Sequence, residues 1–566
     1  METQTAARPK RIGDMLVEAG LITPEQLETA VALHRQENKK IGQVLVEKGF
    51  ISATTLATFI SYQLNLPLVD LKKCKIQPAA VRLVPEEMAR RYNLLPVAID
   101  GGDLLVAMED PLDLRVIGEV SARSRLRLKP MLATAAEIQE AIGLIYKATG
   151  EIEQQVKQII TVAPVREEAE ARLTAQLLAQ APVVRTVDLL VSQAVKDRAS
   201  DIHIEPQEDH LHIRYRIDGI LHEMMTLPLS AHAPLLSRIK ILADMNIAER
   251  RRPQDGQFSV TVDGKEIDIR AATAESVWGE MATLRVLDKS LSVLALSELG
   301  FLPDMQRVYE QVLKTPYGMV LISGPTGSGK TTTLYASVNR LDRQARNVMT
   351  IEDPIEYRFG DINQIQVNPL ADITFATGLR AIMRLDPDVI LVGEVRDAET
   401  ARTAVHAALT GHLVLSSVHA NDAVGALFRL LDLGIEPFLI TSALVAVAAQ
   451  RLVRRVCPHC RTLAPASEEE AVAYESEMGE RRSEFYYGAG CNFCAYTGFL
   501  GRTGVFEVLV MTEELRYSLL AKNSVSEIKA QAIKQGMVPM RRDGMLKARD
   551  GITTPGEVLR SVFVLG

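Results

Sequence analysis

Hydrophobic positions at the start of the chain recur with a helical period, and the same pattern is written twice. Residues 10–27 read KRIGDMLVEAGLITPEQL and residues 39–56 read KKIGQVLVEKGFISATTL, an offset of 29 positions. In both copies apolar residues return every three or four positions, which is typical of one face of a helix. A glycine then ends the helix, Gly20 in the first copy and Gly49 in the second. The pattern therefore predicts two pairs of short helices over about 10–70.

Further along the chain the hydrophobic pattern changes to strands that alternate with helices. A mixed α/β stretch runs to about 147, and its segment NLLPVAIDGGDLLVAMEDPLD predicts a hairpin. Residues 148–182 are polar and poor in aromatic residues, which indicates a linker with helical tendency. From 183 to about 297 helices alternate with short strands such as HLHIRYRID and EIDIRAAT. From about 300 to 455 buried strands alternate with helices as in a parallel α/β sheet, and PFLITSALVAVAA at 437–449 predicts a buried helix.

Composition and charge narrow the class of protein. The 566 residues are 47% hydrophobic and 24% charged, as in ordinary globular proteins, and they are enough for several domains. The net charge of −7 argues against a protein that coats nucleic acid. The first ten residues, METQTAARPK, lack the apolar core of a signal peptide, and no apolar run reaches the roughly 18 residues of a membrane span. We therefore expect a cytoplasmic protein that contacts a membrane through partners.

The most specific segment is GMVLISGPTGSGKTTTLYASVNRL at 318–341. A buried strand precedes the pattern G-x-x-x-x-G-K-[ST] and an amphipathic helix follows it, as in a P-loop. Backbone N–H groups of the loop can surround phosphates, Lys330 adds a positive charge, and the hydroxyl of Thr331 is a ligand for Mg²⁺. The predicted nucleotide-binding residues are Gly324, Pro325, Thr326, Gly327, Ser328, Gly329, Lys330, Thr331 and Thr332.

Acidic residues follow two further predicted strands. VMTIEDPIEY presents Glu352, Asp353 and Glu356, and DVILVGEVRD places Glu394 just after a strand. Because the carboxyl ends of parallel strands face the ligand crevice, these carboxylates are candidates to orient the attacking water or to hold a metal ion. The alternative is a set of surface acids that cap helices.

Two histidines flank a third predicted strand, in GHLVLSSVHAND. For His412 a structural role is as good an interpretation as a functional one, since a lone histidine is often a satisfied core or surface residue. His419 comes at the end of the strand near the phosphates, so it is the better candidate to sense the γ-phosphate.

Four of the five cysteines form two C-x₂-C pairs, in CPHC and CNFC. Two knuckles of this spacing offer four thiolates for tetrahedral Zn²⁺, and four sulfur ligands leave no open position for catalysis. Redox-active pairs are the alternative, and Cys74 is expected to be a core residue. The predicted zinc ligands are Cys457, Cys460, Cys491 and Cys494.

At these residues the chain resembles a known family. GPTGSGKTTT, TIEDPIEY, ILVGEVRD and TGHLVLSSVHAND are similar to the Walker A, Asp box, Walker B and His box of the secretion ATPase superfamily, and above all to the ATPases of type II secretion and type IV pilus assembly. The segment DIHIEP…IRYRIDG…RRPQDGQFS…EIDIRAAT…LRVLDK resembles their second N-terminal domain. The resemblance implies a recA-like P-loop core, a PAS-like α+β domain before it, and a hexameric motor.

The resemblance also assigns roles to single residues. It makes Glu356, the last acid of the Asp box, the general base, and Glu394 the Walker B acid linked to Mg²⁺. It matches Arg270 and Arg285 to two arginines that reach the nucleotide phosphates from the preceding domain, where charge-assisted contacts stabilise the transition state. Solvated strand arginines are the alternative.

The doubled segment resembles the cyclic di-GMP-binding N-terminal domain of some pilus and secretion ATPases. His34 stands where that pattern has its first glutamine, and Lys40 stands where it has its second arginine. Lysine lacks the bidentate and stacking contacts of arginine, so a docking domain that keeps the fold without the ligand is the alternative. The implied cyclic di-GMP contacts are Arg11, Gly13, His34, Lys40, Gly42, Gln63 and Asp110.

The sequence therefore predicts a multidomain α/β motor ATPase. The resemblance implies a homohexamer that works with an inner-membrane platform protein and a cytoplasmic adaptor at the inner face of the bacterial inner membrane, without nucleic acid. A recA-like nucleic-acid translocase and a nucleotide-gated binding module are the alternatives. The predicted parts are a regulatory or docking domain at 1–147, a linker at 148–182, an arginine-donating domain at 183–297, the P-loop domain at 298–455, a zinc module at 456–500 and a C-terminal helical part at 501–566.

Overall fold

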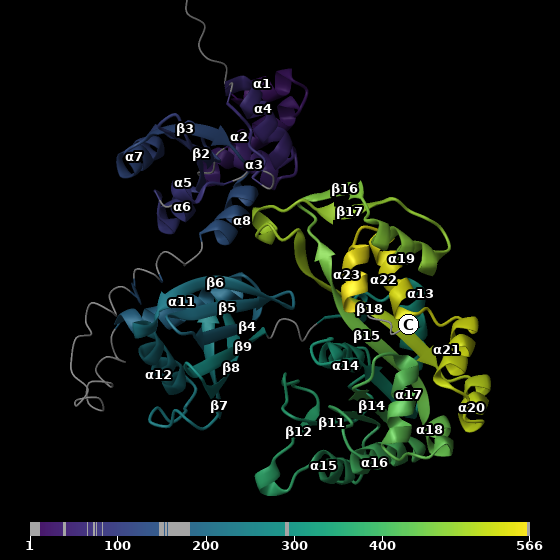
Figure 1. The fold of residues 1–566 in the computed structure, drawn as a ribbon. Helices are drawn as coiled ribbons and strands as arrows, with labels where there is room; N and C mark the ends of the chain where they lie inside the picture. Colours follow the sequence, from purple (N-terminus) through teal and green to yellow (C-terminus); the bar gives the residue numbers. More distant parts are fainter. Residues whose placement is uncertain are drawn as a thin grey trace, which may run out of the picture. The chain divides into compact units, whose positions relative to one another are not determined.

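The computed structural model separates into two compact units. The first comprises residues 1–147 with 490–496, and the second comprises 148–489 with 497–566. Figure 1 shows the elements of both. None of the described helices is both long and apolar enough to cross a membrane. The structure describes residues 12–37, 41–64, 66–71, 74, 76–81, 83–146, 152, 155–156, 181–288 and 294–562.

The doubled segment folds as the two predicted helix pairs. Gly20 and Gly49 have φ angles of 69° and 71°, a left-handed conformation that glycine adopts without strain. Their N–H groups donate to Val17 at 2.9 Å and to Val46 at 3.0 Å, so both copies end their first helix with the same hydrogen bond. The helices are α1 (Ile12–Glu18), α2 (Pro24–Glu37), α3 (Ile41–Glu47) and α4 (Ala53–Leu64).

The repeated glycines near the helix starts have a packing role. A Cβ atom on Gly13 would lie 2.4 Å from Leu27, and one on Gly42 would lie 3.1 Å from Leu56. Both pairs are separated by the same number of positions, so each glycine lets the first helix of its copy approach the second helix. Packing therefore explains the recurrence of these glycines without any ligand.

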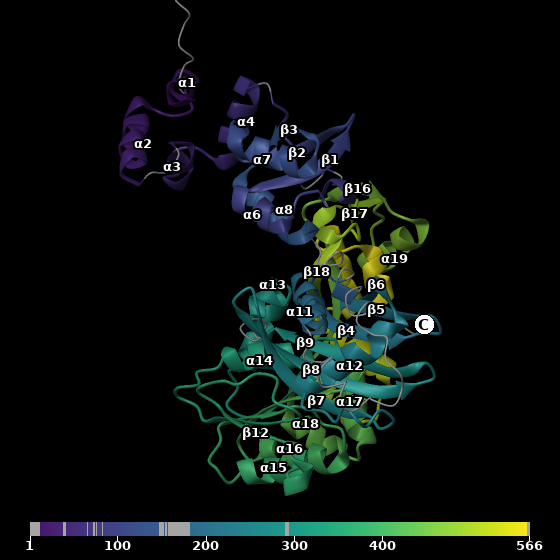
Figure 2. The same cartoon turned by 90° about the vertical axis from the view of Figure 1, so that its left-hand side faces the viewer.

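The remaining part of the first unit is a three-stranded sheet with its own hydrophobic core. The predicted hairpin is confirmed, because Leu94–Asp100 and Asp103–Met108 pair in antiparallel fashion around Gly101 and Gly102. Figure 2 shows this sheet with helices around it. Its elements are α5 (Pro78–Val81), α6 (Glu86–Tyr92), β1 (Leu94–Asp100), β2 (Asp103–Met108), α7 (Leu114–Ser124), β3 (Arg127–Leu132) and α8 (Ala135–Ile145).

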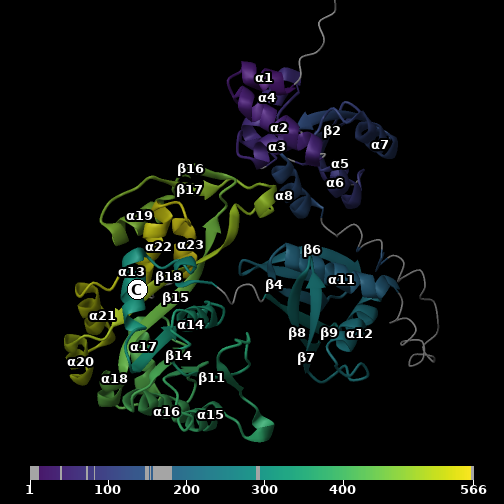
Figure 3. The ribbon, with the colours of Figure 1, turned by 180° about the vertical axis from the view of Figure 1, so that it is seen from behind.

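The second unit begins with a six-stranded antiparallel sheet in the order β6-β5-β4-β9-β8-β7. Helices α11 and α12 pack against it (Figure 3). Most of the predicted linker lies outside the described residues, but Ile152 and Val156 are helical and buried in this core. The elements are α11 (Ala181–Lys196), β4 (Ala199–Pro206), β5 (His210–Ile217), β6 (Ile220–Pro228), α12 (His232–Leu242), β7 (Gln254–Val262), β8 (Lys265–Ser276) and β9 (Gly279–Asp288).

A seven-stranded sheet in the order β12-β11-β13-β14-β10-β15-β18 follows, parallel except for β18. One face packs on α13 and α14, and the other packs on α15–α18, gathered together in Figure 1. The predicted parallel α/β sheet is therefore confirmed. The elements are α13 (Pro303–Val312), β10 (Gly318–Ser323), α14 (Lys330–Asn339), β11 (Val348–Glu352), β12 (Asn363–Gln366), α15 (Phe375–Ile382), β13 (Val389–Val392), α16 (Ala398–Leu409), β14 (Leu413–Val418), α17 (Ala423–Asp432) and α18 (Pro437–Ala443).

The prediction of one buried helix over 437–449 is wrong in its second half. The helix ends at Ala443, and β15 (Leu444–Val456) begins at the next residue. Strand β15 pairs with β10 on one side and with β18 on the other. A short apolar run that is buried on both faces has no period that separates helix from strand, and here sheet pairing decides.

The C-terminal part adds helices and a small hairpin. Strands β16 and β17 pair in antiparallel fashion, and they flank helix α19 along the chain. The elements are β16 (Arg461–Pro465), α19 (Glu468–Met478), β17 (Glu484–Gly488), β18 (Phe499–Val510), α20 (Glu513–Leu520), α21 (Val525–Lys534), α22 (Met540–Arg549) and α23 (Pro555–Ser561).

Candidate nucleotide-binding site

The predicted P-loop connects strand β10 to the first turn of α14. Gly327 and Gly329 have φ angles of 77° and 89°, which only glycine adopts readily. At Gly324 a Cβ atom would lie 2.7 Å from the backbone oxygen of Gln450. Glycine is therefore needed for backbone shape and for close approach. Because the loop ends at the N-terminus of α14, its N–H groups and the helix dipole favour an anion.

Lys330 lies over this loop. Its Nζ donates to the backbone oxygen of Gly324 at 2.9 Å and to that of Pro325 at 3.1 Å. Burial lowers the pKa of Lys330 and the nearby charge of Arg451 lowers it further, while Glu394 acts in the opposite direction. A partly desolvated lysine that donates to two carbonyl groups is well placed to exchange them for phosphate oxygens.

Gln450 in β15 holds the loop in place, a role that the sequence did not reveal. Its side-chain nitrogen donates to the backbone oxygen of Ser328 at 2.7 Å. Its side-chain oxygen accepts from the hydroxyl of Thr333 at 2.7 Å. The amide is buried and joins the loop to the first turns of α14. The sequence signal is limited to Gln450 and the adjacent Arg451, which interrupt an apolar run.

Glu394 and His419 come together as predicted for neighbouring strand ends. Glu394 follows β13, and His419 follows β14. The Nε2 atom of His419 lies 3.5 Å from a carboxylate oxygen of Glu394, and the guanidinium of Arg396 lies 2.5 Å from the other oxygen. His412 lies at the opposite end of the strand, with its Nδ1 2.9 Å from the backbone oxygen of Ala407, which supports its structural interpretation.

The three acids after β11 have different surroundings. Glu352 is buried and hydrogen-bonded, whereas Asp353 is exposed. Glu356 is partly exposed and forms an ion pair with Arg270 of β8, with 2.7 Å between Nη2 and Oε2. Of the three, Glu356 therefore has a carboxylate that reaches solvent and is oriented by a cation.

The two predicted arginines are direct neighbours in the six-stranded sheet. Arg270 in β8 is in register with Arg285 in β9. Arg285 is 61% exposed, and its Nε donates to Asp201 of the same sheet at 3.2 Å. Arg270 therefore reaches Glu356 after β11, while Arg285 is held by its own domain.

Most of the implied cyclic di-GMP contacts lie beyond what the structure describes. Arg11 and Lys40 are outside the described residues, and the side chains of His34 and Gln63 are not described either. Gly13 and Gly42 belong to α1 and α3. Asp110 accepts a hydrogen bond from the backbone N–H of Leu112 at 3.1 Å.

The four predicted zinc ligands come together. Their sulfur atoms all lie within 4.8 Å of one another. Cys491 and Cys494 have sulfur atoms 3.7 Å apart, close to the edge of about 3.8 Å that follows for a tetrahedron with Zn–S bonds of about 2.3 Å. The backbone N–H of Cys491 donates to the sulfur of Cys494 at 3.2 Å. This donor set fits a structural zinc ion.

Comparison with known protein families gives two matches. Residues 176–560 match the family described as type II/IV secretion system protein. Residues 64–152 match the MshEN domain. The first match includes the P-loop, the strand-end acids, both arginines and all four clustered cysteines.

Individual relatives match two thirds of the chain or more. The chain is 39% identical over 555 residues to a type IV pilus assembly ATPase, PilB, of Myxococcus xanthus. That alignment covers 97% of this chain and 98% of PilB. It is 48% identical over 381 residues to a type II secretion system protein E of Klebsiella pneumoniae, and this alignment covers 67% of this chain and 76% of that protein.

A solved structure supports the fold. The Yersinia pseudotuberculosis ATPase DotB aligns with a TM-score of 0.50 and 20% identity, covering 67% of this chain and 93% of that one. This likeness supports the predicted α/β fold. The family match and the PilB relative confirm the ATPase family resemblance inferred from the motifs. The protein belongs to the type II/IV secretion system protein family.

Proposed function

We propose that the protein is a Mg²⁺-dependent ATPase that powers type IV pilus assembly or type II protein secretion as a homohexamer acting on an inner-membrane platform. One observation carries the enzymatic part. Lys330, Glu394, His419 and the arginine-paired Glu356 follow parallel strands of one sheet at their carboxyl ends, where ligands of open α/β sheets bind. The relatives named as pilus and secretion proteins support the coupling to a machine.

The chain's own residues account for binding and orientation. Loop N–H groups and Lys330 bind the phosphates, and the exposed hydroxyl of Thr331 together with Glu394 would hold the metal ion. The metal, when bound, supplies positive charge beside the phosphate oxygens. Glu356 accepts the proton of the attacking water. His419, which shares the site of Glu394, senses the γ-phosphate.

Arg270 has a second role in this proposal. In the structure it pairs with Glu356, which occupies the arginine and orients the carboxylate. When a nucleotide binds, its phosphates compete for the guanidinium, because Arg–phosphate contacts are strong and bidentate. Arg270 then passes from the base to the phosphates. Arg285, displaced from Asp201 in the same way, supplies the second positive charge as the two domains of the second unit close.

Two regulatory or structural ligands complete the proposal. Zinc binds the four clustered cysteines and fixes the loops that carry them. The first unit binds cyclic di-GMP in this proposal, which rests on the resemblance of the doubled segment. The match to the MshEN domain covers 64–152 and includes one implied contact, Asp110. The packing of Gly13, repeated at Gly42, favours a fold kept for its own stability, so a docking role without the ligand is the competing interpretation.

Two variants test the assigned roles. Lys330→Ala is expected to lose both ATP binding and turnover, because the main positive charge of the loop is gone. Glu356→Gln keeps the shape of the side chain but cannot accept a proton, so ATP binding should persist while turnover falls by about 100-fold or more. Phosphate release and nucleotide binding would be measured side by side. Wild-type turnover in Glu356→Gln would contradict the assignment of the base.

A further inference from the structure

A buried tyrosine joins the nucleotide-binding helix to the loop that carries Glu356. Tyr335 lies one and a half turns into α14 and is 1% exposed. Its hydroxyl donates to a carboxylate oxygen of buried Glu352. The same hydroxyl accepts a hydrogen bond from the backbone N–H of Glu356 at 3.3 Å. One oxygen atom thus connects the helix that starts at Lys330 with the backbone of the proposed base.

Glu352 is itself held in place, so it forms a fixed anchor for the tyrosine. Its other carboxylate oxygen accepts from the hydroxyl of Thr350 at 2.7 Å and from the side chain of Gln364 at 3.1 Å. All these groups lie on β11 and on its neighbour β12. The carboxylate therefore acts within the protein rather than on a ligand, although the sequence presents it beside Glu356.

Gln364 extends the network along the loop. Its side chain donates to the backbone oxygen of Tyr357 at 2.8 Å and accepts from the backbone N–H of Phe359 at 2.8 Å. The rings of Tyr357 and Phe359 both meet the ring of Tyr335 edge-on, with centroids 5.8 Å and 5.2 Å away. The loop after Glu356 is thus fixed by hydrogen bonds and by ring contacts.

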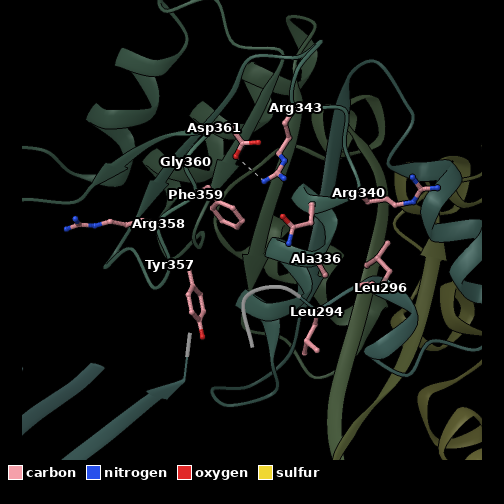
Figure 4. Close-up of a pocket in the computed structure, with 12 residues that line it drawn as sticks. Leu294, Leu296, Ala336, Arg340, Arg343, Tyr357, Arg358, Phe359, Gly360 and Asp361 are labelled. Atoms are coloured by element: carbon pink, nitrogen blue, oxygen red, sulfur yellow. Dashed lines mark ion pairs between the residues drawn. The ribbon is translucent and has the colours of Figure 1, made fainter. Parts of the chain in front are cut away.

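A cavity lies beyond these rings. It has a volume of about 510 Å³ and is lined by Tyr357 and Phe359 as well as by Arg343 and Asp361. Figure 4 shows these residues, with Arg343 paired to Asp361 at 3.2 Å. Arg343 also lies over the ring of Phe359, 5.6 Å from its centroid. Tyr335 and Gln364 support the loop on the side of β11, and Arg343 supports it at the cavity.

We propose that Tyr335 is a positioning residue for ATP hydrolysis, whose hydroxyl holds the backbone of Glu356 at a fixed place relative to the phosphate-binding end of α14. This inference rests on the proposed role of Glu356 as general base. The tyrosine touches neither the nucleotide nor the water. It acts on Glu356 through the main chain, while Arg270 acts on the side chain.

Chemistry favours tyrosine for this task. Burial raises the pKa of Tyr335 and the neighbouring Glu352 raises it further, so the phenol keeps its proton and remains a donor. A phenol can donate one hydrogen bond and accept another at the same time. Phenylalanine would fill the same space and keep the ring contacts, but it would leave the N–H of Glu356 and the carboxylate of Glu352 without this partner.

The test compares two phenylalanine variants in the full chain. Tyr335→Phe is expected to lower kcat by about 10- to 100-fold, since a base misplaced by an ångström costs about that much, with KM for ATP within about 2-fold of wild type. Tyr309→Phe is the matched control. Its buried hydroxyl also reaches α14, lying 2.8 Å from that of Ser337 on the same helix rather than from the loop of Glu356. The kcat of this variant should stay within about 2-fold of wild type.

A double variant shows whether Tyr335 works through Glu356. In the Glu356→Gln background, Tyr335→Phe is expected to change the residual rate by less than about 2-fold, because the base is already absent. An equal loss of rate in both backgrounds would overturn the inference. So would an unchanged kcat in Tyr335→Phe, or a raised KM with kcat intact. Wild-type turnover in Glu356→Gln alone would instead overturn the proposed base. Melting temperatures would confirm that all variants fold.

Discussion

Carboxylates that look alike in the sequence have separate tasks in the structure. Glu352 and Glu356 lie four positions apart in the Asp box, yet one is a buried anchor and the other reaches solvent and Arg270. Glu394 is grouped with His419 and the P-loop lysine. The motif predicts that acids gather at these strand ends. Burial and hydrogen bonding, which depend on the folded neighbours, decide what each acid does.

Residues outside the motifs were not predictable from the sequence. Gln450 lies more than a hundred positions from the P-loop whose backbone it holds. Tyr335 lies inside the P-loop helix, where the pattern predicts that an aromatic residue belongs to the hydrophobic core. Both act through hydrogen bonds to backbone groups of distant segments, and no spacing rule along the chain encodes such contacts. The P-loop and the cysteine pairs were predictable because each motif carries its chemistry locally.

One prediction at this scale concerns Glu557 and acid stability. Burial raises the pKa of Glu557, but hydrogen bonds from Arg560 and Arg454 outweigh it and bring the pKa to about 2. A carboxylate with a depressed folded pKa stabilises the protein above its unfolded pKa, and that contribution is lost as pH falls toward the folded value. The shift from 4.5 to about 2 corresponds to about 3 kcal/mol.

The measurement is chemical unfolding of the wild type and of Glu557→Gln between pH 7 and pH 3. The wild type should be the more stable protein at pH 7, and the difference between the two should shrink as the pH falls below about 4.5. A difference that stays constant over this range would contradict the assignment. Arg560, whose guanidinium lies 2.8 Å from Glu557, offers Arg560→Gln as a second variant with the same expected trend.

At the scale of elements, the sequence predicted helices and strands correctly where local residues determine the backbone conformation. The helix pairs of the repeat end at left-handed glycines, and the hairpin of the first unit turns at Gly101 and Gly102. It failed over 437–449, where a helix gives way to strand β15 at Leu444. That strand forms because β10 and β18 lie on its two sides. Because these pairing partners lie far away along the chain, the apolar run itself carries no sequence signal of them.

The loop that carries the second cysteine pair gives a prediction at the element scale. A Cβ atom on Gly488 would lie 2.0 Å from the backbone oxygen of Gly498, which accepts the N–H of Cys457 at 2.9 Å. Gly488→Ala should therefore push apart the two backbone segments that position the cysteines. We expect zinc content, measured by mass spectrometry of the metal, to fall well below one ion per chain.

Gly479→Ala is the control for this prediction. Gly479 ends helix α19 with a φ angle of 77°, and a Cβ atom there would meet nothing within 4 Å. Alanine in this left-handed conformation costs about 1–2 kcal/mol, so stability should fall slightly while zinc is retained. Full zinc content in Gly488→Ala, or equal loss in both variants, would contradict the account of the cysteine loop.

At the scale of the whole molecule, the order of motifs was enough to identify the family, because four linked motifs in sequence are rarely matched by chance. The motifs do not settle the role of the first unit. Its fold follows from glycine packing and helix caps, and these leave open which ligand it binds. Arg11 and Lys40 lie outside the described residues, so a binding measurement has to decide.

Cyclic di-GMP titration of the full chain by calorimetry is that measurement. Binding is expected, and it should vanish in Arg11→Ala. Lys40→Arg should bind more tightly, because arginine adds bidentate and stacking contacts that lysine lacks. At Gly20, which follows α1, an added Cβ atom would meet nothing within 4 Å, so Gly20→Asn is a control that keeps the left-handed turn. Absence of binding in both the wild type and Lys40→Arg would leave the first unit as a docking domain.

The central claim is that this chain turns over ATP as a motor of secretion type. Phosphate release by the full chain, with Mg²⁺ and ATP and with or without DNA or RNA, tests it most directly. The account predicts steady turnover that requires Mg²⁺, is lost in Lys330→Ala and is unchanged by nucleic acid. ATP binding without phosphate release would contradict it in favour of a nucleotide-gated binding module, and strong stimulation by DNA or RNA would contradict it in favour of a translocase.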